Sequence, residues 1–91
     1  MTLKRPDEAR VRLLLRESLI LDVTEEICRL LATRGVRRSE LAKTLGIPRS
    51  SVVRLLDGDA QTPISRIADV FWALGAKLEV HAVPIDKQEA P

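Results

Sequence analysis

The chain has 91 residues, with 15 lysines and arginines against 13 acidic residues and a net charge of +2. This length suits one small domain, and one tryptophan and one phenylalanine, with no tyrosine, cannot build a stacking platform for single-stranded nucleic acid. A single cysteine excludes an internal disulfide. Because neither a secretory signal nor a membrane-length apolar run is evident, we expect a cytoplasmic protein with no membrane contact.

The N-terminal segment, residues 1–20, is rich in leucine and arginine and predicts a helix over residues 6–20. Pro6 suits a first helical turn, and acidic residues directly after it favour a helix N-terminus. Two apolar runs, at residues 13–15 and 19–21, exceed what one narrow stripe needs. They indicate either a second contact surface or packing on the rest of the domain.

A second helix is expected to run to about Arg34, where Gly35 would end it. Asp22 and Glu25 resemble a capping box at its start, but the sequence leaves open whether it continues the first helix. Cys28 fits its apolar pattern as a small buried residue. The residues expected on its inner face are Val23, Ile27, Leu30 and Leu31.

Residues 38–57 read RSELAKTLGIPRSSVVRLLD and predict two short amphipathic helices joined by a turn at Gly46. Ser39 can cap the first helix, and the second runs from about Pro48 to Leu56. Ala42 falls where the two backbones come closest. The apolar side chains expected inside this wedge are Leu41, Leu45, Ile47, Val52, Leu55 and Leu56. The pattern is typical of a DNA-reading helix-turn-helix.

Rotation by about 100° per residue places Ser50 and Arg54 opposite Val52, with Arg49 at the exposed start of the second helix. Because major-groove base edges contact the outer and N-terminal residues of such a helix, we expect base contacts there. The base-contact candidates are Arg49, Ser50 and Arg54, with Ser51 and Val53 as weaker ones. The phosphate-contact candidates are Arg37, Arg38, Ser39 and Lys43.

The window from residue 34 to residue 54 holds six cations and one anion, Glu40, and so carries +5. The rest of the chain then carries 2 − 5 = −3. A solvated helical face would explain this charge, but its coincidence with the two-helix pattern favours a phosphate-facing patch.

After a polar loop, Thr62 and Pro63 predict the start of a further helix, which Gly75 ends. Residues 77–83 alternate and predict a strand with one apolar side. A lone strand cannot satisfy its backbone groups, so we expect antiparallel pairing with the same strand of a second copy, or else with another protein. The residues expected to dimerise are Leu78, Val80 and Ala82. The domain then spans residues 21–76, the strand 77–84 and a disordered tail 85–91.

The run ELAKTLGIPRSSVVRLLDG, followed by a TPxxxxADVFWALG helix, resembles the Xre/Cro-type helix-turn-helix family over about residues 20–76. The resemblance implies an all-α, lambda-repressor-like bundle of about five helices that binds operator DNA as a dimer and represses its own operon. The added C-terminal strand resembles antitoxins of bacterial toxin–antitoxin pairs, which neutralise a toxin partner. Pro48 departs from the family, where a capping Ser or Thr is frequent at this position.

We therefore expect a sequence-specific transcriptional regulator of double-stranded DNA, a homodimeric autorepressor and antitoxin acting on a pseudo-palindromic operator. The alternative is a protein-interaction module that mainly neutralises a partner protein, with DNA binding secondary. We expect no enzyme, metal or cofactor, because the sequence has no phosphate-binding glycine loop, metal-ligand cluster or nucleophile with a base. The sole histidine, His81, lies on the polar side of the expected strand.

Overall fold

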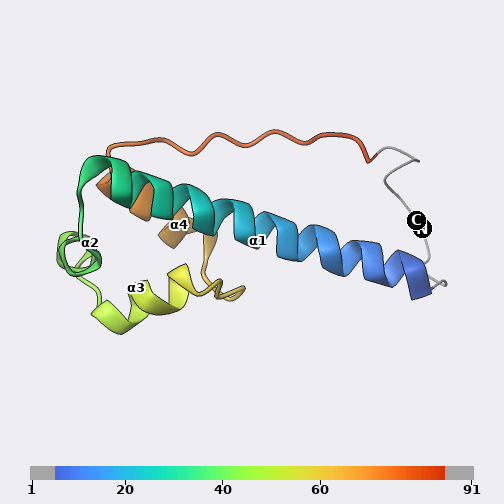
Figure 1. Ribbon diagram of the computed structural model, residues 1–91, viewed down its shortest axis with the longest axis horizontal. Helices are drawn as coiled ribbons and strands as arrows, with labels where there is room; N and C mark the ends of the chain where they lie inside the picture. Colours follow the sequence, from blue (N-terminus) through green and yellow to red (C-terminus); the bar gives the residue numbers. More distant parts are fainter. Residues whose placement is uncertain (1–5, 86–91) are drawn as a thin grey trace.

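Four helices make up the part of the chain that the computed structural model describes, residues 6–85. They are α1 (Pro6–Arg34), α2 (Arg38–Leu45), α3 (Arg49–Leu56) and α4 (Ile64–Ala73), arranged as Figure 1 shows. The expected all-α class is confirmed. The expected count of about five helices is wrong for these residues, because the first two predicted helices are one.

The longest element, α1, is a continuous helix of 29 residues. Glycine and proline are absent from residues 7–34, so nothing interrupts its backbone hydrogen bonds. The expectation that Asp22 and Glu25 cap a helix is therefore wrong, since both lie inside α1, and the expected boundary at residue 20 falls there too. None of the helices in residues 6–85 combines the length and apolar character that a membrane crossing requires.

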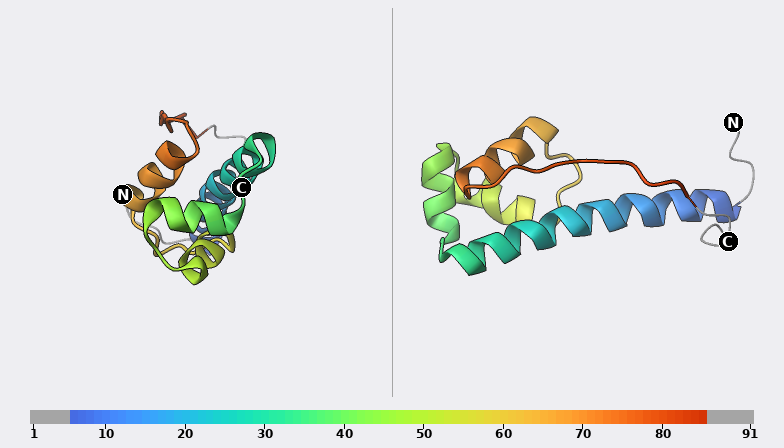
Figure 2. Two further views of the ribbon diagram at one scale, coloured as in Figure 1. Left: turned by 90° about the vertical axis from the view of Figure 1, so that its left-hand side faces the viewer. Right: turned by 90° about the horizontal axis from the view of Figure 1, so that it is seen from above.

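The core lies between the C-terminal half of α1 and the three short helices, which gather at that end of the molecule (Figure 2). Apolar residues that recur every three or four positions turn one face of each helix inward. Ile27, Val52 and Val70, from three different helices, are fully buried. The other buried side chains are Leu30, Leu31, Leu41, Ala42, Leu55, Leu56, Phe71 and Leu74. Leu45 and Ile47, also expected inside, are partly buried at the edge of this core.

The C-terminal segment, residues 76–85, contains no strand. The strand expected over residues 77–83 is therefore wrong for this chain by itself, because residues 6–85 hold no second strand to pair with it. The segment instead runs back along α1 in the opposite direction (Figures 1 and 2). Leu78 packs partly against the core, whereas Val80 and Ala82 are exposed. The expected tail lies, apart from Ile85, outside the described residues.

We predict that Ile27→Ala lowers the free energy of unfolding by about 2–5 kcal/mol, because it removes three carbon atoms from a fully buried side chain and leaves a cavity. Ile64→Ala is the matched control, since it makes the same chemical change at a side chain that is 79% exposed. Its effect should stay within about 0.5 kcal/mol. Urea denaturation followed by circular dichroism measures both, and equal losses would contradict the core described above.

Candidate nucleic-acid interface

The turn between α2 and α3 is built on Gly46, which has a left-handed backbone with φ of 66° and ψ of 35°. Its N–H donates to the Lys43 carbonyl at 3.2 Å, and the Ile47 N–H donates to the Ala42 carbonyl at 3.0 Å. This pair of hydrogen bonds is a Schellman motif, which satisfies the last carbonyls of α2 and reverses the chain sharply. We call residues 38–56 the α2–α3 unit.

Burial on one side of α3 determines which of its residues face water. Val52, Leu55 and Leu56 are buried against the rest of the core. As the rotation of the helix requires, the expected base-contact residues Arg49, Ser50, Val53 and Arg54 are exposed, and Ser51 is half-buried. The polar face of α3 is therefore open along the whole helix.

The start of α3 is set by proline rather than by a side-chain cap. Pro48 is the N-cap residue, with φ of −62° and ψ of 147°, and makes no side-chain hydrogen bond. Its carbonyl accepts the Ser51 N–H at 3.0 Å, which begins the helix at Arg49. The proline ring fixes this entry angle, so the position of Arg49 does not depend on a capping hydroxyl.

The start of α2 differs from the sequence expectation. Ser39 does not cap this helix, because Arg37 is the N-cap residue and Ser39 lies inside the first turn. The Glu40 carboxylate accepts the Arg37 backbone N–H at 2.9 Å and its Nε–H at 3.2 Å. The backbone hydrogen bond first, and the side-chain hydrogen bond second, lower the pKa of Glu40. This acidic residue therefore caps the start of α2 and offsets part of the charge of Arg37.

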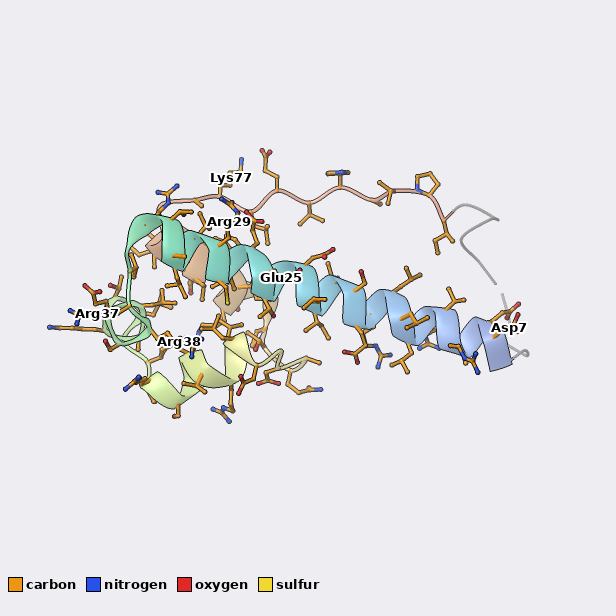
Figure 3. All side chains as sticks on the ribbon, in the orientation of Figure 1. Asp7, Glu25, Arg29, Arg37, Arg38 and Lys77 are labelled. Carbon is orange, nitrogen blue, oxygen red and sulfur yellow. The ribbon has the colours of Figure 1, made fainter. Side chains whose placement is uncertain are left out.

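Two hollows flank α3 and gather the expected contact residues. One, of about 470 Å³, lies where the end of α1 meets the starts of α2 and α3. Its polar lining is Arg37, Arg38, Ser39 and Arg49, over an apolar floor that includes Cys28 and Leu31. Figure 3 shows Arg37 and Arg38 at the α2 end of the molecule, far from Asp7 at the start of α1. Three phosphate candidates and one base candidate thus share one surface.

The second hollow, of about 160 Å³, lies beside the other part of α3. Its lining brings together Ser51 and Arg54 of α3 and Arg66 of α4, and also includes Asp59. Arg66 is a cation of this surface that the sequence analysis missed, because nothing in the local pattern of α4 says which helix it meets. Lys43 lines neither hollow.

The cations of this surface remain open to a ligand. Among residues 6–85, the salt bridges are Arg29–Glu26, Arg37–Glu40 and Lys77–Glu79. Arg38, Lys43, Arg49 and Arg54 therefore form no ion pair with an acidic group in the described part of the chain. Their positive charges are not neutralised by ion pairs within residues 6–85, so they are available to an anionic partner.

Comparisons with models of known protein families, with curated proteins and with solved structures each find no match to this chain. The α2–α3 surface is therefore described only by its own shape and charge. Those consist of a protruding short helix with a polar outer face, cations on both sides of it, and a buried apolar back.

We predict that an NMR titration places the pKa of Glu40 below its ordinary value, since the Arg37 N–H donates to the charged form. A lowered pKa stabilises the fold above the unfolded pKa, and this contribution disappears as the pH falls through the folded value. The stability difference between wild type and Glu40→Gln should therefore be present at neutral pH and vanish in acid.

Arg37→Met is the control, because it removes the guanidinium and keeps the backbone donor. Its Glu40 pKa should still lie below the ordinary value. A Glu40 pKa at or above that value in the wild-type protein would contradict the capping arrangement.

Proposed function

We propose that the chain is a sequence-specific double-stranded DNA-binding protein whose α3 enters the major groove as the recognition helix of a helix-turn-helix. The observation that carries the proposal is the open polar face of α3 between two arginine-lined hollows. A B-DNA major groove is wide enough for one α-helix, and a helix that is buried only on its back can enter it. The resemblance of residues 20–76 to the Xre/Cro-type family supports the same reading.

We assign the recognition of the DNA base sequence to the outer residues of α3. Arg49 and Arg54 can each donate two hydrogen bonds to a guanine edge, and Ser50 can donate to or accept from several bases. Val53 is 36% exposed, which leaves its methyl groups accessible to a thymine methyl. Ser51 is half-buried and is the weaker candidate of the set.

Positioning on the duplex is assigned to the start and side of α2. Arg37, Arg38, Ser39 and Lys43 are exposed there. Contacts from such residues to phosphates fix the orientation of the protein without reading sequence. Arg66, beside Arg54, extends the cationic surface onto α4. Since Glu40 holds Arg37 from within the fold, we assign the stronger phosphate contact to Arg38.

The biological role that we propose is transcriptional autorepression by a homodimer on a pseudo-palindromic operator, combined with neutralisation of a toxin. Residues 77–83 are extended and Val80 is 81% exposed, which leaves this segment free to pair with a second copy or with another protein. The alternative role, a module that mainly neutralises a partner protein, is supported by the exposed leucines of α1.

We predict that Arg49→Ala and Arg54→Ala each weaken binding to a duplex selected from a random library by about 5- to 150-fold, equivalent to about 1–3 kcal/mol. Each change should also relax the preference at one base position. Lys43→Ala should weaken binding equally across sequences and reduce the salt slope by about 1. Fluorescence anisotropy at several salt concentrations measures all three effects.

Arg29→Ala is the matched control, because Arg29 is an exposed arginine on the side of α1 opposite α3 (Figure 3). It should leave sequence preference and salt slope unchanged. A selection that enriches no sequence, or equal losses in Arg29→Ala and Arg49→Ala, would contradict the assignment of α3 as the recognition helix.

We further predict that the product of the neighbouring gene, if it is a toxin, co-purifies with the full chain and loses its growth inhibition. DNA binding by the complex is then the readout that separates the two roles. A complex that neutralises the toxin but selects no DNA sequence would favour the alternative role.

A further inference from the structure

The N-terminal half of α1 extends past the other helices (Figures 1 and 2) and carries a large apolar surface. Its five leucines are between 48% and 65% exposed, and they are Leu13, Leu14, Leu15, Leu19 and Leu21. Successive residues of a helix point in directions about 100° apart, so these side chains are spread around the axis rather than along one stripe. Residues 76–85 run beside part of this surface, where Leu78 and Val80 share hollows with Leu19. The leucines nevertheless stay about half exposed or more, so the described part of the chain leaves much of their apolar surface in contact with water.

The charges of this half are sorted along its length. Residues 10–16 contain three arginines and no acidic residue, whereas residues 17–26 contain four acidic residues and no basic one. Glu26 is already paired with Arg29 on the same helix. Among residues 10–26, the charges that form no salt bridge with another residue of 6–85 are thus three basic against three acidic. They are Arg10, Arg12 and Arg16 against Glu17, Asp22 and Glu25.

This order of charges is complementary to itself when the helix direction is reversed. A second α1 lying antiparallel, centred between residues 17 and 18, places the basic segment of each copy against the acidic segment of the other. Arg10 then lies level with Glu25, and Leu14 lies level with Leu21. A parallel pair would instead place like charges together, which disfavours association.

The apolar contacts fit the same register. Leu14 and Leu21 are seven residues apart, or two turns, and so lie on one side of α1. Ser18 lies between them and is exposed. A small residue at the centre of a helix pair lets the two backbones approach while the leucines on either side interlock.

We propose that two copies of this chain associate through an antiparallel pairing of the N-terminal halves of α1, centred near residues 17 and 18. The two α2–α3 units then lie at opposite ends of the helix pair. The proposal rests on the leucines and sorted charges of α1 alone. It does not depend on DNA binding, nor on pairing of residues 77–83, so it can fail while the proposed function stands.

Sedimentation equilibrium of the full-length chain tests the charges. The wild type should be a dimer at micromolar concentration. Arg10→Glu and Glu25→Arg should each weaken self-association by at least about tenfold, because residues 10 and 25 are level on the contact side and like charges then face each other twice in the dimer. An equimolar mixture of the two variants should recover the dimer, which also shows that both have kept a competent α1.

The matched control is Arg38→Glu, which reverses one charge on the α2–α3 unit instead. Its dimer should persist at the wild-type concentration. A wild-type chain that is still monomeric at about 100 µM would overturn the proposal. That concentration is on the order of a hundred times the micromolar one at which the dimer is expected. A dimer that survives both α1 reversals would overturn it as well.

Disulfide cross-linking tests the direction of the pair. In a Cys28→Ser background, Ser18→Cys should oxidise to a covalent dimer, since the two residues lie near the twofold axis. Leu14→Cys should cross-link with Leu21→Cys in a mixture of the two proteins, and little with itself. Efficient self-linking of Leu14→Cys would indicate a parallel pair and overturn the proposal, as would the absence of any cross-link at these positions.

Discussion

The burial of Val52 is the constraint from which the rest of the proposed interface follows. Val52 is fully buried together with Ile27 of α1 and Leu41 of α2, so α3 has only one rotation about its axis. That rotation turns Arg49, Ser50 and Arg54 toward water. A polar or larger side chain at position 52 would change the direction of all three together. Packing of the apolar core thus determines the direction in which the polar face of α3 points.

The amino-acid pattern predicts the structure correctly where local chemistry decides it. Gly46 has the left-handed backbone that the turn needs, and the inward and outward residues of α3 follow its helical period. The amino-acid pattern is misleading where several local signals must be weighed against the whole fold. Asp22 and Glu25 look like a capping box, yet the uninterrupted helix-forming sequence around them overrides it. Ser39 looks like an N-cap, but the hydrogen bond from the Arg37 N–H to the Glu40 carboxylate begins α2 two residues earlier, at Arg38.

Other features of the structure cannot be predicted from the local amino-acid pattern. The place of Arg66 beside Arg54 depends on how α4 packs, and residues 77–83 form no strand in a chain that has nothing to pair them with. The projecting half of α1 shows the same limit. Its leucines were visible in the sequence, but only the fold shows that the described elements leave them about half exposed or more. An exposed apolar surface that a single chain leaves uncovered is where association with another protein molecule is expected.

The most direct test of the central claim is an NMR titration of the isotope-labelled full chain with a selected duplex. The outward face of α3 should respond, with the largest amide shifts confined to residues 37–54 and to Arg66. Residues 10–26 of α1 should be affected little. Shifts concentrated on α1 or on residues 76–85, with α3 unperturbed, would contradict the account.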